Sequence, residues 1–391
     1  MLPFAGSVLR SIAKPVSRQV RCFATIEEKS AKSFKDYMLE TVLKKEQENC
    51  YATLVSATGS SLLDGYLETH NFSFLLTSSI DKKTDRLLVV SNGPDGDAIA
   101  KRALAKGIPT DWACHPSILP MDPEEAAEDV VFREKVTHVI FMHVESFTGA
   151  ITPLHQIISR LRRVRQDVSL CVDNRSAFCL HPMPQVNEIV DYSINETSKL
   201  GVSPAFGFMT AHLPSIIAEA HRHPDHVLSS MYNSEMTIER MVPAVQKKYE
   251  AAFAEKSWEV LSYQYEEAKA RLVNKVRSLL PLIPFGTDQS CFSSAFLVPQ
   301  EVCGLRELLS SLGELGVKVE YRFITPGLPS ISFLTSELIR FEEEGGNMMD
   351  IYKSIEKVTR HRKTNFVPDM NFIKQEAEYR KKQIFGERAG K

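Results

Sequence analysis

Between residues 51 and 208, short apolar runs alternate with longer amphipathic segments. Each apolar run breaks into small polar residues, as buried strands of a parallel sheet do, while the segments between them have helical spacing. The predicted strands begin at Tyr51, Arg86, His138, Val168 and Ile189; the predicted helices are 99–105, 123–135 and 153–165, with a loop over 112–121. This alternation predicts an α/β fold, a three-layer αβα domain on a mainly parallel sheet.

The second half of the chain predicts a smaller α+β domain. A long amphipathic helical stretch covers 237–280 and is followed by shorter strand and helix patterns up to Val358. We therefore expect a large domain over 25–250, a small C-terminal domain over 251–360 and a helical tail over 361–391. The tail carries eight basic and four acidic side chains. It is expected either to pack on the small domain or to bind a protein partner.

Composition narrows the functional classes. The 391 residues are 43% hydrophobic and 25% charged, with a net charge of −2, which gives no indication of nucleic-acid binding. No apolar run approaches the roughly 20 residues of a membrane-spanning helix. The seven cysteines are scattered without a CxxC pair, which argues against a zinc site or a disulfide framework.

The first 24 residues differ from the rest. Four basic residues, three serines and an apolar side occur before the first acidic residue, Glu27. This make-up is typical of a mitochondrial transit peptide, although a basic tail without structure has a similar composition. We expect residues 1–24 to be a transit peptide and the mature protein to reside in the mitochondrial matrix.

An acid and a lysine follow two consecutive predicted strands. Asp173 ends one and Lys199 follows the next, 26 residues later. Ligand sites of α/β sheets lie at the carboxyl ends of strands. Pyridoxal phosphate chemistry needs this pair, since a lysine forms the Schiff base and a carboxylate keeps the pyridine nitrogen protonated. The alternatives are that Asp173 caps a helix and that Lys199 is a solvated surface residue.

A turn of small polar residues follows the first predicted strand. Thr58, Gly59 and Ser60 precede a helical pattern, and such a turn can present amides and hydroxyls to a phosphate. A simple helix N-cap at Ser60 explains the same residues.

Several motifs in this order resemble the class V aminotransferases of the fold-type I pyridoxal phosphate enzymes, notably 2-aminoethylphosphonate:pyruvate and alanine:glyoxylate aminotransferases. His143–Gly149 (HVESFTG) is similar to the family's H-x-E-T/S-S-T-G. Val172–Phe178 (VDNRSAF) is similar to V-D-A-x-S-S-F, and Lys199–Phe208 resembles K-x-x-x-G-x-P-G-F-G-F, one residue shorter. Asn92-Gly93 resembles the family's S-N-G turn.

This resemblance implies a role for each candidate residue. Lys199 is the Schiff-base lysine and proton shuttle, and Asp173 pairs with the pyridinium nitrogen. Ser146 is implied near the ring hydroxyl. The phosphate ligands are implied to be Thr58, Gly59, Ser60 and Ser198. The resemblance also implies a homodimer, because the active sites of the family lie between subunits.

The chain departs from the family pattern at two ligand-binding positions. Asp95 occupies the turn from which the family stacks an aromatic ring on the cofactor. The stretch 330–337, which corresponds to the family's F-R-I-G-x-x-G motif, lacks the arginine that binds the substrate carboxylate. Arg322 or Arg340 are the candidates to replace it. The T-P-P-T segment of the family is not recognisable near 231–245.

Three functions remain. The first is an aminotransferase that moves an amino group from a small amine or amino acid to a 2-oxo acid, as aminoethylphosphonate and pyruvate are paired in the family. The second is a homologue without full catalytic capacity that serves as a structural or partner-binding subunit. The third, a lyase or desulfurase, is disfavoured because no cysteine lies in a recognisable loop motif.

Overall fold

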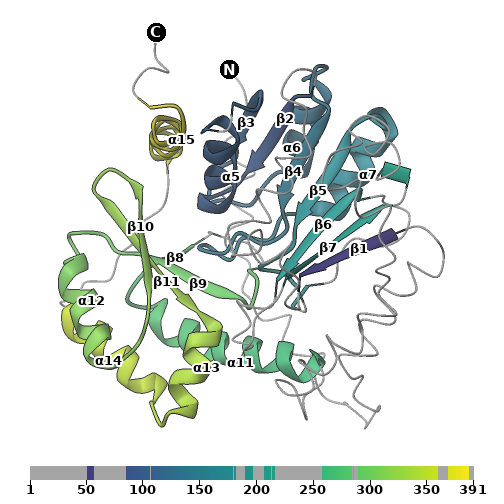
Figure 1. The fold of residues 1–391 in the computed structure, drawn as a ribbon. Coiled ribbons are helices and arrows are strands. Elements are labelled where there is room, and N and C mark those ends of the chain that lie inside the picture. Colours follow the sequence, from purple (N-terminus) through teal and green to yellow (C-terminus); the bar gives the residue numbers. More distant parts are fainter. Residues whose placement is uncertain are drawn as a thin grey trace.

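The structure is a computed structural model that describes residues 51–56, 85–105, 107–178, 180–181, 190–196, 207–212, 214–215, 258–283, 285, 289–359 and 369–386. Its strands form one seven-stranded and one four-stranded sheet. Figure 1 shows the larger sheet with the first half of the chain and the smaller sheet with the second half.

The seven-stranded sheet has the order β1-β7-β6-β5-β4-β2-β3. Its strands are β1 (Tyr51–Ser56), β2 (Leu87–Ser91), β3 (Thr110–Cys114), β4 (His138–Met142), β5 (Ser169–Asp173), β6 (Tyr192–Glu196) and β7 (Gly207–His212). Strands β3, β2, β4, β5 and β6 pair in parallel, and only β7 runs antiparallel to its neighbours β6 and β1. The prediction of a mainly parallel sheet is therefore confirmed.

Helices cover both faces of this sheet (Figure 1). Leu87 and Val89 of β2 pack with helix α5 (Pro94–Ala105), whereas Leu88 and Val90 point to the opposite face. That face packs against α6 (Pro123–Val131) and α7 (Leu154–Val164). Because successive residues of a strand alternate between faces, one unbroken apolar run supplies both cores. The result is the expected three-layer αβα arrangement.

The four-stranded sheet is antiparallel throughout, with the order β10-β11-β9-β8. Its strands are β8 (Leu282–Ile283), β9 (Ser293–Leu297), β10 (Glu320–Thr325) and β11 (Leu328–Leu334). The helices that accompany it are α11 (Trp258–Val276), α12 (Leu305–Glu314), α13 (Thr335–Glu343) and α14 (Met348–Val358). This is the expected smaller α+β unit.

Three elements differ from the sequence prediction. Strand β3 lies partly in the predicted loop 112–121, because it is an edge strand with mostly half-buried residues and lacks an apolar run. Helix α5 begins at Pro94 and not at 99, since a proline is compatible with the first turn of a helix. Helix α13 was not predicted. The domain boundaries themselves stay predictions.

The tail forms helix α15 (Met370–Phe385), whose N-cap Asp369 accepts a hydrogen bond from the amide of Phe372. Figure 1 shows α15 beside α5 and above the β10–β11 hairpin, and it contacts both α5 and β10. The helix therefore packs on the large sheet as well as on the small one. None of the described helices is long and apolar enough to span a membrane.

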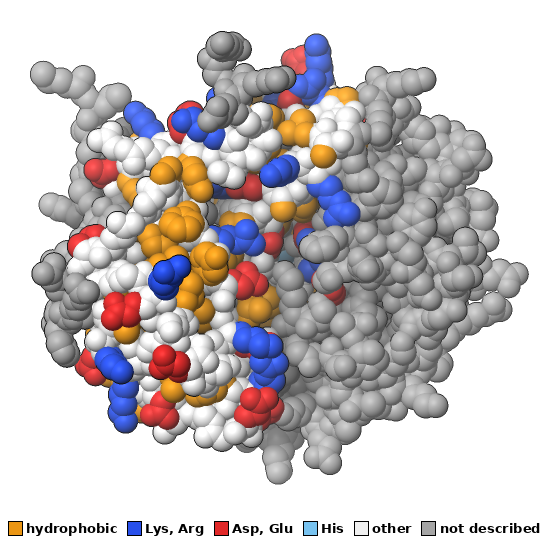
Figure 2. Space-filling model, turned by 60° about the vertical axis from the view of Figure 1, so that its left-hand side comes forward, with side chains coloured by type: hydrophobic (Ala, Val, Ile, Leu, Met, Phe, Trp, Pro, Cys, Tyr) orange, Lys and Arg blue, Asp and Glu red, His pale blue; other side chains and the backbone are white. Residues whose placement is uncertain are grey.

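The surface on the side of the small sheet mixes all side-chain types. Figure 2 shows a group of hydrophobic side chains there, among separate basic and acidic ones. Tyr321 and Phe323 of the edge strand β10 are 55% and 44% exposed.

Gly149 joins the two sheets at a point where no side chain fits. Its φ is 73°, and a Cβ would lie 2.9 Å from the carbonyl oxygen of Ser293 in β9. Its own carbonyl oxygen accepts a hydrogen bond from the amide of Ser290 at 2.9 Å. Close approach of the two backbones therefore depends on glycine.

We expect Gly149→Ala to lower the free energy of unfolding more than Gly327→Ala does, as measured by urea denaturation. Gly327 has a φ of 85° but nothing within 4 Å of its missing Cβ, so alanine there costs only the left-handed strain, about 1–2 kcal/mol. The additional clash at Gly149 should add at least about 1 kcal/mol. Equal losses would show that the contact with Ser293 is unimportant.

Candidate active site

The carboxyl ends of the parallel strands bring several polar residues to one edge of the large sheet. Asp173 is paired in register with Met142 of β4 and with Ile194 of β6. The backbone amide of His143 donates to the carbonyl of Asp173 at 2.9 Å, and that of Asn174 donates to Ile194 at 2.8 Å. The segments that follow β4 and β5 therefore begin side by side, next to the last residues of β6.

Asp173, the last residue of β5, is 5% exposed, and its carboxylate forms an ion pair with Arg175. Arg175 donates from Nε to Oδ1 at 2.8 Å and from Nη2 to Oδ2 at 2.5 Å. Burial disfavours the charge on Arg175, but Asp173 outweighs it and raises the pKa of the guanidinium. A charge-assisted bidentate pair of this kind fixes the orientation of the carboxylate.

The predicted partner of Asp173 lies outside the described residues. Lys199 and Ser198 follow the end of β6 at Glu196, and Thr58, Gly59 and Ser60 follow the end of β1 at Ser56. The structure therefore brings together Asp173 and the strand that leads to Lys199. The convergence of the two side chains stays a prediction, as do the phosphate ligands.

The turn after β4 is organised around Glu145, which is completely buried. Its Oε2 accepts hydrogen bonds from the amide of Thr148 at 2.6 Å and from its hydroxyl at 2.9 Å. Its Oε1 accepts one from the amide of Asp95 at 3.3 Å. Burial, followed by the negative charge of Asp95, raises the pKa of Glu145 to about 7.

Ser146 and Asp95 contact each other directly. The amide of Ser146 donates to Oδ2 of Asp95 at 2.9 Å, so the turn after β4 and the first turn of α5 are bonded in both directions. A Cβ on Gly93 would lie 2.5 Å from Cγ of Glu145, which shows how closely the two turns approach. Asp95, which takes the place of the expected aromatic residue, therefore binds a backbone amide of the candidate site.

A chain of buried polar contacts continues beneath this edge. Nδ1 of His143 lies 2.7 Å from Oδ1 of Asn174, whose amide group donates to Oδ1 of Asn195 at 2.7 Å. The rings of His143 and His181 meet edge to face at 6.2 Å between centroids. Burial lowers the pKa of His181 to about 4 and also lowers that of His143, so both rings are neutral at neutral pH.

The chain of contacts reaches helix α11 of the second half. Nε2 of His181 lies 2.7 Å from the hydroxyl of Ser290, and Nζ of Lys269 donates to the carbonyl of Ser290 at 2.6 Å. Burial lowers the pKa of Lys269 to about 7. No motif in the sequence indicated His181 or Lys269, whereas Glu145 and Arg175 lie inside the quoted motifs without an assigned role.

Among the described residues of this edge, acidic side chains outnumber basic ones. The described acids are Asp95, Glu145, Asp173 and Glu196, and Arg175 is committed to Asp173. Such a surface favours a ligand with a protonated nitrogen. An anionic group of the same ligand needs donors from other segments. Among the described residues no group of three or more His, Cys, Asp or Glu side chains could hold a metal ion.

Sheet order, the single antiparallel strand and the second antiparallel sheet together give the chain the fold of the fold-type I pyridoxal phosphate transferases, as predicted. The chain superimposes on ureidoglycine-glyoxylate aminotransferase from Bacillus subtilis with a TM-score of 0.60 at 15% identity, over 96% of this chain and 94% of that one. It superimposes on alanine–glyoxylate aminotransferase from Nostoc sp. with a TM-score of 0.60 at 16% identity, over 78% and 81%.

Sequence comparison finds similar proteins of one kind. The chain is 27% identical over 173 residues to a 2-aminoethylphosphonate–pyruvate transaminase of Klebsiella pneumoniae, and 29% identical over 187 residues to one of Bacteroides fragilis. These matches cover 43% and 46% of this chain and 42% and 50% of the relatives, so the chain spans about half the length of the relatives it matches. No protein-family model matches. The resemblance to class V aminotransferases is confirmed, at strong divergence.

The raised pKa of Glu145 predicts a pH dependence of stability. The unfolded chain releases this proton near pH 4.5 and the folded chain near pH 7, so the folded state binds more protons in between. The contribution of Glu145 to the free energy of unfolding is therefore fully present below about pH 4.5 and is lost as the pH rises through about 7. The free energy of unfolding falls by at most about 1.4 kcal/mol per pH unit in this range.

We expect Glu145→Gln to flatten the fall in unfolding free energy between about pH 5 and about pH 8, measured by urea denaturation. Glu128→Gln, an exposed position in α6, is the control and should leave the fall unchanged. Parallel curves for wild type and Glu145→Gln would contradict the assignment.

Proposed function

We propose that this chain is a pyridoxal phosphate-dependent aminotransferase that transfers an amino group from a small amine or amino acid to a 2-oxo acid. The observation that carries the proposal is the buried carboxylate of Asp173 at the end of β5, beside the parallel strand that leads to Lys199. The similar proteins are named transaminases, which favours a catalyst over a structural homologue.

The described residues fit the cofactor's ring. Oδ1 of Asp173 accepts hydrogen bonds from the amide and from Nε of Arg175, and Oδ2 accepts one from Nη2. Because each carboxylate oxygen has two acceptor sites, Oδ2 keeps one for a pyridinium N–H. The excess of carboxylates at this edge favours that cation. Thr58, Gly59, Ser60 and Ser198 would supply the phosphate with amide and hydroxyl donors.

When bound, pyridoxal phosphate supplies an electron sink for the carbanion that forms at the substrate's α-carbon. In this proposal Lys199 attaches the cofactor and moves the proton at the α-carbon. Asp173, held by Arg175, would keep the ring nitrogen protonated, and Ser146 would bind the ring hydroxyl. Glu145 holds the turn that carries Ser146.

Arg322 is the better placed of the two arginines that could bind the substrate's acidic group. It pairs with Ser330 of β11, in the stretch where the family's arginine is missing, and directly paired residues project from the same face of a sheet. Its guanidinium carbon lies 5.5 Å from the centroid of the Phe147 ring, next to Ser146. Arg340, in contrast, pairs with Glu337 and Glu344.

The proposed cellular setting is the mitochondrial matrix, with residues 1–24 removed, and the proposed assembly is a homodimer. Sequencing the N-terminus of the mature protein and measuring its mass in solution by light scattering test these two points independently of catalysis.

We expect borohydride reduction of the purified protein with pyridoxal phosphate to attach the cofactor at Lys199, as read by peptide mass mapping. Lys199→Ala should abolish this product and lower the rate of half-transamination by about a hundredfold or more. Attachment of the cofactor at another residue, or no attachment at all, would refute the proposed function.

For Arg322→Gln we expect KM for the 2-oxo acid to rise about tenfold to a hundredfold, because a charge-assisted hydrogen bond to the carboxylate is lost. The matched control is Arg340→Gln, which removes only exposed ion pairs and should change KM little. A larger effect at Arg340 would reverse the assignment.

A further inference from the structure

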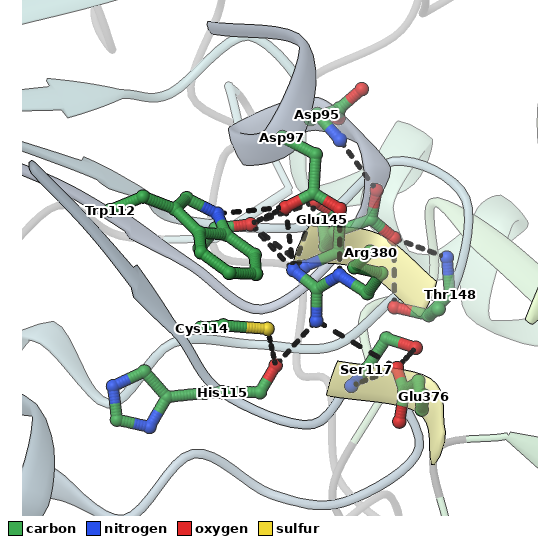
Figure 3. A network of polar contacts seen from close by, with 12 residues as sticks. Asp95, Asp97, Trp112, Cys114, His115, Ser117, Glu145, Thr148, Glu376 and Arg380 are labelled. Carbon is green, nitrogen blue, oxygen red and sulfur yellow. Dashed lines mark hydrogen bonds and ion pairs between the residues drawn. The ribbon is translucent and has the colours of Figure 1, made fainter. Parts of the chain in front are cut away.

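Helix α15 contributes a buried arginine to the large domain. The side chain of Arg380 is 8% exposed, and its Nε and Nη2 donate to the two carboxylate oxygens of Asp97 at 2.6 and 2.7 Å. Its Nη1 donates to the carbonyl of His115 at 2.6 Å, and its guanidinium carbon lies 5.7 Å from the centroid of the Trp112 ring. Figure 3 shows this guanidinium at the centre of the contacts.

The same guanidinium holds the turn between β2 and α5. Its Nη2 donates to the hydroxyl of Ser91 at 2.7 Å and lies 3.5 Å from the carbonyl of Gly93. Ser91 and Trp112 in turn donate to Oδ1 of Asp97, at 2.6 and 3.1 Å. Arg380 therefore binds both ends of the segment 91–97, which carries Asp95.

The N-terminal half of α15 packs on an apolar cluster to which the other turn of the site also contributes. Phe372 and Ile373 pack on the apolar cluster that includes Phe147, the residue after Ser146. Between the two halves, the carboxylate of Glu376 accepts a hydrogen bond from the amide of Ser117 at 2.8 Å. The cluster also contains Ile283, Leu297 and Ile324 of the small sheet, so α15 touches both parts of the molecule.

The turn between β2 and α5 and the turn after β4 meet at the hydrogen bond from the amide of Ser146 to the carboxylate of Asp95. Arg380 fixes the turn that carries Asp95, while Phe372 and Ile373 pack on the apolar cluster to which Phe147 of the other turn belongs. One helix, distant in sequence from both turns, therefore binds one side of this contact directly and shares an apolar cluster with the other, as Figure 3 shows for the Arg380 side. Simple packing of a terminal helix needs an apolar stripe, not a buried cation that binds a loop.

We propose that α15 is a built-in positioning element of the candidate active site, with Arg380 as the positioning residue that keeps Asp95 in register with Ser146. The helix thus acts as an internal clamp through its buried face. The proposal rests on the proposed function only in calling this region an active site. The contacts of Arg380 themselves do not depend on any activity.

Hydrogen exchange of the substrate-free protein tests the clamp, with peptides that cover 93–97 and 145–149 as the readout. We expect Arg380→Met to speed exchange in both by about tenfold or more, because the bonds that hold the first turn are charge-assisted. The reference is α7, on the opposite face of the sheet, whose exchange should stay unchanged. The matched control is Lys381→Met, which removes an exposed cation from the adjacent position.

A second variant distinguishes the loss of these specific contacts from general misfolding. Arg380→Lys keeps the cation but cannot reach Asp97, Ser91 and His115 at once, so an intermediate rate at both turns is expected. Unchanged exchange at 93–97 and 145–149, or an equal increase in α7, would overturn the proposal. If these exchange changes are found but the wild-type protein has no transaminase activity, the clamp stands and only the proposed function fails.

Discussion

Parallel pairing of β4, β5 and β6 is the constraint on which the candidate site depends. The register that places Met142, Asp173 and Ile194 side by side makes three connecting segments begin at one edge. Asp173 is a useful carboxylate only because its own strand stops there and because Arg175 immediately turns back to hold it. A slip of one residue would turn Asp173 to the opposite face of the sheet.

Polar contacts join the two sheets, beside the apolar cluster that contains Phe147 and residues of the small sheet. The hydroxyl of Ser332 in β11 donates to the carbonyl of Phe147 at 2.6 Å, and the amide of Ser290 donates to that of Gly149. Lys269 binds the same short segment from α11. Because buried polar groups are costly without partners, these bonds allow few alternative orientations of the two halves.

Local sequence signals predicted most of the fold but only part of the site. Apolar runs identified β2, β4 and β5, since strands buried on both faces carry the strongest pattern. The edge strand β3 was missed because its residues are mixed. The sequence pattern shows Arg380 only as one of eight basic residues of the predicted tail helix, since nothing near it in sequence reveals that it pairs with Asp97. Contacts between distant segments leave no local pattern.

The place of α15 in the core has a consequence for biosynthesis. Ile384 belongs to the same apolar cluster as Leu87 and Val89 of β2, yet almost three hundred residues separate them. During translation the N-terminal half of the chain emerges long before the segment that covers one of its faces. Completion of that cluster must therefore wait until the segment that forms α15 has left the ribosome, and until then the apolar surface that Ile384 covers is a natural target for chaperones.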